Sequence, residues 1–402
     1  MALRTLKVGA ETARMLQLGH PWVIADRYTA AWPASLHPGQ LARLQAPDGG
    51  LLGTALLEPG ARVVARLLDR DLVDPGAGWF SRRLQAAEQL RERFLDLDRT
   101  DAFRLVNGEG DGLPGLTVDR YRDWLVVQFY TPAWQPYLKP LLAALEKTWR
   151  PAGIYLKQRP QQTRNLKQQF GSEEQLVELV AGKPAPEKLT VREHGLRYLV
   201  RLNAGLHTGL FLDQRDNRRR FGRWCRDRKV LNLFCFTGAF SVAAVAAGAA
   251  GVTSVDASRH YLDWVRDNAE LNGQSPQQHE LLCGDCRKVL KRLARENRLF
   301  DLVFVDPPSF STTRKGKFSS RGGTAEIIAA LLAVLKPGGL VMACSNHQKM
   351  EIADYLKELR RGGLDAGRNL KVIDQRGQGG DFPYPVGFPE GRYLKVVTLV
   401  AD

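Results

Sequence analysis

The feature that most constrains the fold is a regular alternation of short apolar runs and helical segments from about residue 190 onward. Five apolar runs of strand length occur there in the order KVLNLFCF, GVTSVDAS, HELLCGD, FDLVFVDPP and GGLVMACS. Segments with helical apolar spacing separate them, and a late run, YLKVVTLV, lies near the C-terminus. Continuous apolar strands that alternate with helices are typical of a parallel sheet covered on both faces. The pattern therefore predicts an α/β domain over 189–402.

The preceding residues show a different pattern. Within 1–72, the runs LARLQAP and LLGTALL are joined by a Gly-rich turn, which is typical of a β-hairpin, and VVARLLD follows as another strand. Within 73–188, a helical segment at 79–98, a Gly-rich loop and the strand WLVVQFY indicate an α+β unit. The Pro- and Lys-rich stretch 180–189 is typical of a linker. We expect a small β-barrel over 1–72, a central α+β domain over 73–188 and the α/β domain over 189–402.

Charge and cysteine content narrow the class of protein. The net charge is +15, from 58 Lys+Arg and 43 Asp+Glu, which favours a polyanionic partner and nucleic acid first, with an ordinary basic surface as the alternative. Five cysteines at irregular spacing form no disulfide framework and suggest a reducing cytoplasm. The one CxxC, Cys283 to Cys286, has no second pair, so we expect no metal. The most apolar window, 239–255, is too short to span a membrane, and we expect none.

Polar or glycine residues stand at the ends of four successive predicted strands. Gly238 follows the first, Asp256 ends the second, Asp285 follows the third and Asp306 ends the fourth. Because the carboxyl ends of parallel strands meet at one edge of a sheet, these residues are predicted to line one crevice. Asp256 suits hydrogen bonding to ribose hydroxyls, and Asp285 suits an adenine amino group, although both also suit helix N-caps. The single glycine of the first turn does not form GxGxxG, which argues against a nicotinamide dehydrogenase.

Several stretches carry a resemblance to a known family. They are HPWV, NGEGDGLPGLTVDRY, TGLFLDQRDNR, LNLFCFTGAF, VDASRHYLDW and DLVFVDPPSFS. The part over 190–402 resembles a class I S-adenosylmethionine-dependent methyltransferase, and the whole chain is similar to the bacterial 23S rRNA large-subunit methyltransferases that carry an N-terminal PUA domain. The resemblance implies a Rossmann-like sheet preceded by a PUA barrel and a central RNA-binding domain. It also implies S-adenosyl-L-methionine as cofactor, 23S rRNA (naked or in an assembling subunit) as partner and a cytoplasmic enzyme, and it leaves a homodimer open.

The resemblance also implies roles for individual residues. The cofactor is expected to contact Phe211, Asp213, Gln214, Arg215, Asn232, Phe234, Thr237, Gly238, Asp256, Ala257, Ser258, Asp285, Cys286 and Asp306. The target base is expected to face Asp306, Pro307, Pro308 and Phe310. Phe310 is either a stacking platform for an unstacked base or a side chain packed under the Pro-Pro turn. RNA phosphates are expected to contact Arg218, Arg219, Arg220, Arg314, Lys315 and Lys317.

The stretch ACSNHQKM bears on the atom that is methylated. Cytosine C5 is not nucleophilic, so enzymes that methylate it first attack C6 with a cysteine thiolate, whereas guanine N7 already carries a lone pair. Members of the family that act on cytosine C5 carry Ser-Cys-Ser after the fifth strand, and their Cys corresponds to Asn346 here, two residues past Cys344. The Ser-Asn step resembles the guanine-N7 branch.

We therefore expect attack by a nitrogen, guanine N7 first, with Asn346 hydrogen-bonded to the flipped base. Cytosine C5 methylation through Cys344 remains an alternative, and Cys344 is otherwise a small buried side chain. A further alternative is a non-catalytic RNA-binding or ribosome-assembly factor, against which the complete set of strand-end residues argues.

Overall fold

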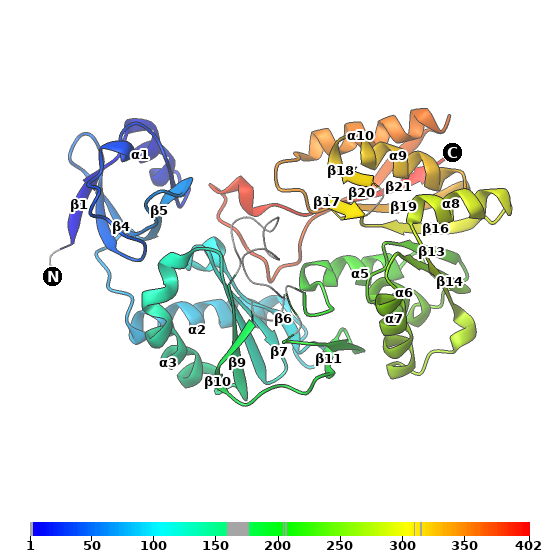
Figure 1. Ribbon diagram of the computed structural model, residues 1–402, viewed down its shortest axis with the longest axis horizontal. Coiled ribbons are helices and arrows are strands. Elements are labelled where there is room, and N and C mark those ends of the chain that lie inside the picture. Colours follow the sequence, from blue (N-terminus) through cyan, green and yellow to red (C-terminus); the bar gives the residue numbers. More distant parts are fainter. Residues whose placement is uncertain (1–2, 159–176, 204, 206, 309, 314–315) are drawn as a thin grey trace. The chain divides into compact units, whose positions relative to one another are not determined.

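The computed structural model describes residues 3–158, 177–203, 205, 207–308, 310–313 and 316–402. The chain forms two compact units (Figure 1). The first comprises Met1–Leu189, Arg201–Thr208 and Gly380–Gly391, and the second comprises Thr190–Val200, Gly209–Gly379 and Arg392–Asp402. The chain thus leaves the second unit twice and returns to it, an arrangement that the sequence pattern does not reveal. Among the described residues, no helix is both long and apolar enough to cross a membrane.

The first unit contains two sheets. The elements of the N-terminal sheet and its helices are β1 (Arg4–Lys7), α1 (Ala10–Gln17), β2 (Trp22–Ile24), η1 (Thr29–Ala31), β3 (Leu41–Gln45), β4 (Leu51–Leu57) and β5 (Val63–Asp69). The strand order is β1-β3-β4-β5-β2, and the antiparallel pairing of β3 with β4 confirms the predicted hairpin. Buried aliphatic side chains from α1 and these strands form its core.

The second sheet of this unit has the order β10-β9-β8-β7-β6. Its elements are α2 (Ala77–Phe94), β6 (Ala102–Asn107), η2 (Gly108–Asp111), β7 (Leu116–Tyr121), β8 (Trp124–Phe129), η3 (Pro132–Tyr137), α3 (Leu138–Trp149), β9 (Gly153–Gln158) and β10 (Val177–Gly182). Helices α2 and α3 contribute large buried side chains to one core with the sheet. Strand β10 occupies the first residues of the stretch 180–189, which was expected to be a linker.

The stretches HPWV and NGEGDG meet in the first unit. Trp22 donates a hydrogen bond from Nε1 to Glu109 across 2.8 Å, and its ring lies edge-on to Phe388 at 4.6 Å between centroids. His20 also contacts the Phe388 ring edge-on, at 5.3 Å. These contacts join the N-terminal sheet, η2 and the segment Gly380–Gly391. The two stretches therefore have a structural role within the first unit.

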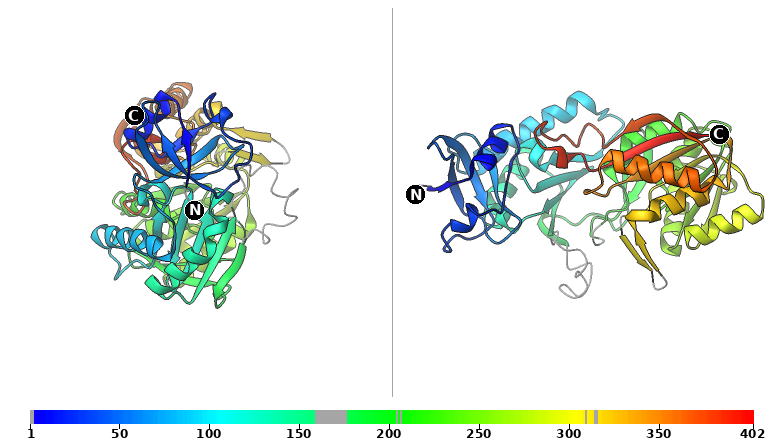
Figure 2. Two further views of the ribbon diagram at one scale, coloured as in Figure 1. Left: turned by 90° about the vertical axis from the view of Figure 1, so that its left-hand side faces the viewer. Right: turned by 90° about the horizontal axis from the view of Figure 1, so that it is seen from above.

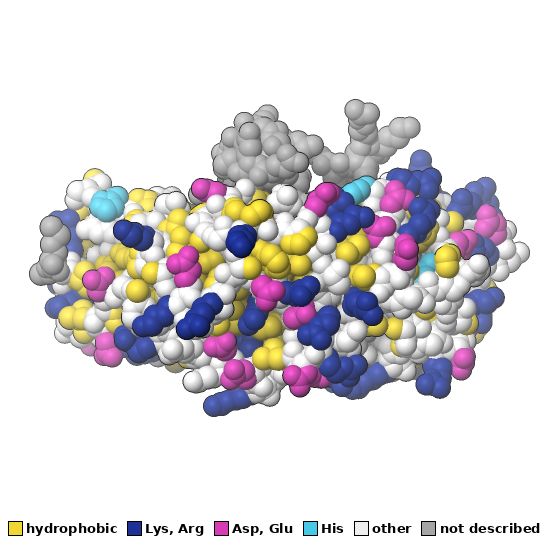
Figure 3. Space-filling model, turned by 90° about the horizontal axis from the view of Figure 1, so that it is seen from below, with side chains coloured by type: hydrophobic (Ala, Val, Ile, Leu, Met, Phe, Trp, Pro, Cys, Tyr) yellow, Lys and Arg dark blue, Asp and Glu magenta, His cyan; other side chains and the backbone are white. Residues whose placement is uncertain are grey.

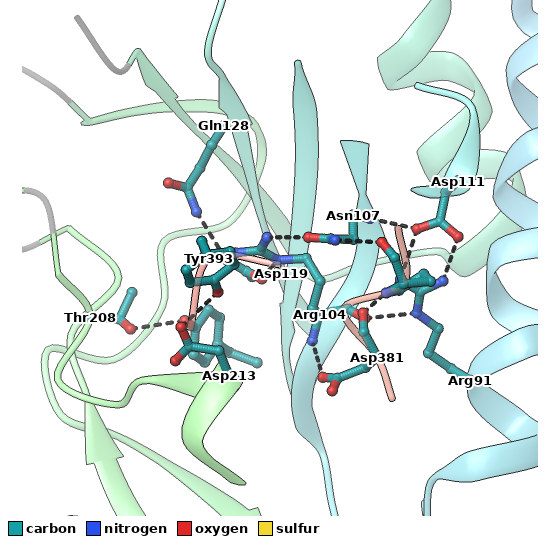
Figure 4. Close-up of polar contacts among 12 residues, drawn as sticks. Arg91, Arg104, Asn107, Asp111, Asp119, Gln128, Thr208, Asp213, Asp381 and Tyr393 are labelled. Carbon is teal, nitrogen blue, oxygen red and sulfur yellow. Dashed lines mark hydrogen bonds and ion pairs between the residues drawn. The ribbon is translucent and has the colours of Figure 1, made fainter. Parts of the chain in front are cut away.

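A buried polar network fastens Gly380–Gly391 to the central sheet (Figure 4). Arg91 forms a two-bond ion pair with Asp111, at 2.6 and 2.8 Å, and also donates to the backbone carbonyl of Asp381. The Asp381 carboxylate accepts from the backbone N–H of Arg104 at 3.0 Å. Because charged groups buried without partners are costly, this satisfied network holds the segment in one place.

The second unit carries the predicted α/β domain. Its elements are β11 (Leu189–Glu193), β12 (Leu196–Val200), η6 (Leu212–Gln214), α5 (Arg215–Gly222), β13 (Lys229–Leu233), α6 (Ala239–Ala246), β14 (Gly251–Asp256), α7 (Arg259–Leu271), η7 (Pro276–Gln278), β15 (His279–Cys283), α8 (Cys286–Arg295), β16 (Phe300–Val305), β17 (Phe310–Thr313), β18 (Gly316–Ser319), α9 (Ser320–Leu332), β19 (Leu335–Ser345), α10 (Ile352–Asp365), β20 (Leu370–Arg376) and β21 (Lys395–Ala401). A short 3-10 helix, η8 (Pro389–Gly391), belongs to the segment Gly380–Gly391 of the first unit and precedes β21 in the chain. The antiparallel hairpin of β17 and β18 projects from the unit (Figure 2).

The main sheet has seven strands in the order β15-β14-β13-β16-β19-β21-β20. The five strands predicted from apolar runs, β13 to β16 and β19, are parallel, but β21 and β20 run antiparallel to their neighbours. The sheet is therefore mixed: the five strands of the predicted pattern are parallel, and two antiparallel strands, β21 and β20, complete it. The chain order reverses between β13 and β16, and at such a point the loops after adjacent strands separate and leave room for a ligand.

Helices cover both faces of this sheet (Figure 1). Helices α8, α9 and α10 pack on one face, and α5 and α6 pack on the other. Helix α8 illustrates the sequence logic, because its buried residues Cys286, Val289, Leu290 and Leu293 recur at the spacing of one helix face. The fold class expected from the sequence, a Rossmann-like sheet after a PUA-like sheet and a central α+β domain, is confirmed.

Candidate active site

The loop after β13 has an unusual backbone. Phe234, Phe236 and Gly238 have φ values of 56°, 50° and 77°. This left-handed region is ordinary for glycine but costs bulky residues roughly 1–3 kcal/mol, and such residues cluster at functional sites. Gly238 is further constrained, because a Cβ there would lie 2.6 Å from Cγ1 of Val265 on α7. The loop is therefore held in a tight shape at the switch point of the sheet.

Asp256, at the end of β14, fastens this loop. Its Oδ2 accepts a hydrogen bond from the backbone N–H of Phe236 at 3.0 Å, and its Oδ1 accepts from Ser258 at 2.9 Å. Burial raises the pKa of this half-buried carboxyl, and the backbone donors oppose that shift. Each carboxylate oxygen has two acceptor positions, so capacity remains for further donors. Ser258 also caps α7, while Ala257 is exposed.

An aromatic row borders Asp256. Phe211, which is 39% exposed, lies against Phe236 at 5.1 Å between centroids, and Phe236 meets Tyr261 edge-on at 4.5 Å. Phe234 is half-buried and packs on the main core instead. The sequence interpretation included Phe211 and Phe234 but missed Phe236 and Tyr261, because nothing local shows that their rings face one another.

Two predicted residues lie deeper than a surface contact requires. Asn232 is 1% exposed and donates from Nδ2 to Oγ of Ser241 at 2.8 Å, whereas its Oδ1 is buried without a hydrogen-bond partner. The Thr237 hydroxyl donates to the carbonyl of Gly209 at 2.6 Å. Thr237 therefore links the loop to the segment before η6, and Asn232 presents an unsatisfied acceptor beneath the loop.

The end of β15 is organised by a helix cap. Asp285 is exposed and accepts from the backbone N–H groups of Arg287 at 3.0 Å and Lys288 at 3.2 Å, so it is the N-cap of α8. This is the second reading that its sequence position allowed. Its neighbour Cys286 is 4% exposed, and burial raises the pKa of its thiol to about 12.

Asp306, after β16, faces a polar cluster from η6 and α5. Gln214 is 3% exposed and donates from Nε2 to Oδ2 of Asp306 at 3.1 Å, while its Oε1 accepts from Asn217 at 2.9 Å. Asp213 accepts from the hydroxyl of Tyr393 at 2.7 Å (Figure 4). Burial and the nearby carboxylate of Asp213 raise the pKa of Asp306 to about 7, against the bond from Gln214. A carboxyl group with this pKa exists in both protonation states at neutral pH.

The structure separates the predicted arginines into internal and surface groups. Arg218 is 2% exposed and donates from Nε to Glu193 on β11 at 2.7 Å and from its terminal nitrogen to the carbonyl of Phe211 at 2.8 Å. Arg215 is 1% exposed and donates to Asp216 at 3.2 Å. Arg218 is thus in an internal ion pair, which corrects its expected place at RNA phosphates.

The remaining predicted residues form four pairs. Arg219 is exposed and Arg220 half-buried on α5, while Pro307 is buried and Pro308 exposed after β16. Phe310 and Lys317 lie on β17 and β18, but the structure does not describe their side chains. Arg314 and Lys315 lie outside the described residues.

Cys344 and Asn346 have opposite environments. Cys344 is 0% exposed in an apolar cluster that includes Phe240, Phe304 and Met342. Burial, with the nearby Asp306 carboxyl, raises the pKa of the Cys344 thiol well above its usual value. Asn346 follows the last residue of β19 and is exposed.

The comparisons with known proteins identify the families that the chain matches. Residues 103–383 match the model of the S-adenosylmethionine-dependent methyltransferase family, and residues 6–70 match that of the PUA-like domain. The chain is 33% identical over 380 residues to the ribosomal RNA large subunit methyltransferase I of Erwinia tasmaniensis, covering 94% of each chain. The corresponding protein of Cronobacter sakazakii is 33% identical over 379 residues, again with 94% of each chain covered.

Solved structures show the same likeness across the whole chain. A protein described as a methyltransferase and solved as a complex with SAH superposes with a TM-score of 0.88 and 28% identity, covering 99% of this chain and 100% of the other. A protein from Streptococcus mutans, described as a SAM-dependent methyltransferase, superposes with a TM-score of 0.85 and 28% identity, with the same coverage.

Proposed function

Because the chain belongs to the S-adenosylmethionine-dependent methyltransferase family, together with the ribosomal RNA large subunit methyltransferases I, we propose that it methylates a nitrogen of a 23S rRNA base. Guanine N7 is the favoured atom. The observation that carries the choice of nitrogen is the environment of Cys344, which has no exposed surface and a pKa well above the usual thiol value. A cysteine nucleophile needs the opposite, since the attacking species is an accessible thiolate.

The residues at the strand ends fit S-adenosyl-L-methionine. Asp256 retains acceptor capacity for ribose hydroxyls, and the buried Oδ1 of Asn232 is an unsatisfied acceptor of the kind that an ammonium group would satisfy. Gly238 keeps the loop free of a side chain at its last residue before α6. When bound, the cofactor supplies a methyl group on a sulfonium leaving group that departs without a catalytic acid. The task of the chain is therefore to bind and to orient.

Nitrogen attack sets modest chemical demands on the side chains. Guanine N7 holds a free lone pair, so no base has to remove a proton before transfer. The requirement is to hold the nitrogen in line with the methyl group at about 3–3.5 Å and to exclude water. A base within a duplex cannot reach such a crevice, so the nucleotide must be flipped out or single-stranded. We assign the hydrogen bonds that orient the base to Asn346 and Asp306.

Asp306 suits an orienting role because of its two protonation states near neutral pH. In its protonated form the carboxyl can donate a hydrogen bond to a ring or carbonyl acceptor, and in its ionised form it can accept from an amino group. Gln214 fixes the carboxyl through its bond to Oδ2. Pro307 and Pro308 stiffen the backbone that follows, and Phe310 begins the projecting hairpin. We propose that this hairpin segment faces the base and that Phe310 stacks on it.

The basic surface supplies non-specific affinity for RNA. On the face drawn in Figure 3, Lys and Arg side chains are spread widely, with Asp and Glu between them. We propose that the surface residues Arg219 and Arg220, together with Arg314, Lys315 and Lys317, contact phosphates, and we leave Arg218 out of that set. Each phosphate contact is expected to steepen the dependence of binding on salt by about one log unit.

Nucleoside analysis of methylated RNA tests the proposal directly. Purified protein is incubated with S-adenosyl-L-methionine and 23S rRNA from a strain that lacks the gene, and the product is digested and analysed by mass spectrometry. The expected product is 7-methylguanosine, with Cys344→Ala retaining transfer. 5-Methylcytidine, lost in Cys344→Ala with folding intact, would establish the covalent alternative. Absence of transfer to naked rRNA and to subunit precursors would point to the assembly-factor alternative.

A further inference from the structure

The segment Tyr393–Lys395 leads into β21 and is hydrogen-bonded to two parts of the candidate site, Asp213 in η6 and the loop after β19. We infer that Tyr393 and Lys395 are positioning residues: Lys395 holds the loop that carries Asn346, and Tyr393 holds Asp213 beside Gln214 and Asp306. The inference rests on the proposed role of Asn346 in orienting the base.

The strand pairing places the start of β21 next to the loop that carries Asn346. Strands β19 and β21 run antiparallel, and Ser345, the last residue of β19, pairs with Lys395, the first residue of β21. Asn346 therefore follows the last residue of β19 that pairs with β21. A residue that orients a base needs its position held within about 0.5 Å.

Lys395 provides that anchor through its side chain. Lys395 is 6% exposed, and its Nζ donates to the carbonyl of His347 at 2.7 Å and to the carbonyl of Tyr393 at 3.0 Å. The same His347 carbonyl accepts from the backbone N–H of Met350 at 3.1 Å. The ammonium group thus binds the backbone carbonyl of the residue after Asn346 and links it to the backbone just before β21. Because an ammonium buried without partners is costly, these bonds account for a lysine at this position.

Tyr393 acts on the opposite wall. Its hydroxyl donates to Oδ2 of Asp213 at 2.7 Å, and the next residue, Gln214, donates to Asp306. One short segment, Tyr393–Lys395, is therefore bonded to η6 on one side and to the Asn346 loop on the other. It sets the relative position of Asn346 and Asp306, the two side chains proposed to orient the base.

A double-mutant cycle separates positioning from a general structural role. The variants are Lys395→Met, Asn346→Ala and their combination, with kcat and KM for 23S rRNA and the Kd for S-adenosyl-L-methionine measured for each. Lys395→Met is expected to lower kcat by about a hundredfold, as for a misplaced reacting group, and to leave the cofactor Kd within twofold. If Lys395 acts through Asn346, the double variant is expected to be no slower than the slower single variant.

Two further variants keep the test decisive. Lys371→Met removes an exposed lysine on neighbouring β20 that pairs with Asp402 at 3.2 Å, and we expect wild-type kinetics for it. If Lys395→Met does not fold, Tyr393→Phe removes one hydroxyl only, and it is expected to lower kcat about tenfold, which is the loss of one hydrogen bond of ordinary strength.

The outcomes distinguish this inference from the proposed function. Independent, multiplicative losses of kcat in the cycle, or an equal loss of cofactor affinity, would overturn the positioning role alone. An unchanged kcat for Tyr393→Phe would contradict the positioning role proposed for Tyr393. A 5-methylcytidine product from the wild-type protein would overturn the nitrogen assignment, whereas the kinetic cycle still reports whether Lys395 acts through Asn346.

Discussion

Nε2 of Gln214 donates a hydrogen bond to Oδ2 of Asp306 across 3.1 Å, which joins η6 to the end of β16. Burial and the charge of Asp213 both favour the protonated form of the Asp306 carboxyl, and the hydrogen bond from Gln214 opposes them. The hydrogen bond from Gln214 therefore opposes the upward shift of the pKa of Asp306. This relationship leads to a measurable dependence of stability on pH.

The first prediction concerns that dependence. The pKa of Asp306 rises from 3.8 to about 7 on folding, so between these values the folded state binds more protons than the unfolded state. Stability then decreases as pH increases. The contribution of Asp306 is fully present below pH 3.8 and is lost as pH rises through about 7. Asp306→Asn, which does not titrate, is expected to flatten this part of the curve in urea unfolding at a series of pH values. An unchanged slope would show that Asp306 is ionised throughout.

Several strands of the second unit could be predicted because a strand buried on both faces consists of consecutive apolar residues. Strands β13, β14 and β16 are almost wholly buried, and their sequences are correspondingly rich in apolar residues. Strand β20, LKVIDQR, lies at the edge of the sheet with much of its surface exposed, so its composition does not distinguish it from a loop. The antiparallel direction of β21 was also beyond reach, since an apolar run carries no direction.

The positions of candidate residues could be predicted from the sequence only where those residues follow strands. Asp256 and Asp306 could be placed because the ends of parallel strands meet. Tyr393 contacts Asp213 from 180 residues away, and no local spacing signals such a contact. Arg218 is predicted to lie on the surface because it belongs to the charged run RDNRRR. It is instead buried in an ion pair with Glu193, 25 residues earlier, which local sequence does not reveal.

The second prediction concerns Gly238. Gly238→Ala is expected to destabilise the protein by about 1–2 kcal/mol for its left-handed backbone, with a further cost from the clash with Val265. Gly273→Ala is the matched control, because Gly273 has a φ of 66° and nothing within 4 Å of the added Cβ. Chemical denaturation of both variants isolates the packing part of the effect. Equal losses would mean that α7 shifts to accommodate the methyl group.

The third prediction concerns Asp256. Asp256→Ala removes the acceptor of two backbone N–H groups and the acceptor proposed for ribose hydroxyls. We expect the Kd for S-adenosyl-L-methionine to rise about tenfold or more in calorimetry, consistent with loss of a hydrogen bond to a charged group. Asp263→Ala on α7, which removes an exposed carboxylate paired with Arg266, is the control and is expected to bind normally. Normal binding by Asp256→Ala would restrict that residue to holding the loop.

The last prediction contrasts two adjacent arginines on α5. Arg218→Ala leaves Glu193 buried without its partner, since both side chains are 2% exposed, and breaking a buried pair in this way costs about 3–5 kcal/mol. Arg219→Ala removes an exposed side chain, so we expect stability within about 0.5 kcal/mol of wild type. RNA affinity is expected to show the reverse order. In filter-binding titrations at several salt concentrations, Arg219→Ala should reduce the slope of log K against log salt by about one, whereas Arg218→Ala, assayed below its unfolding temperature, should leave the slope unchanged. A reduced slope for Arg218→Ala would return that residue to the phosphate-binding surface, because only a lost phosphate contact changes the number of ions released.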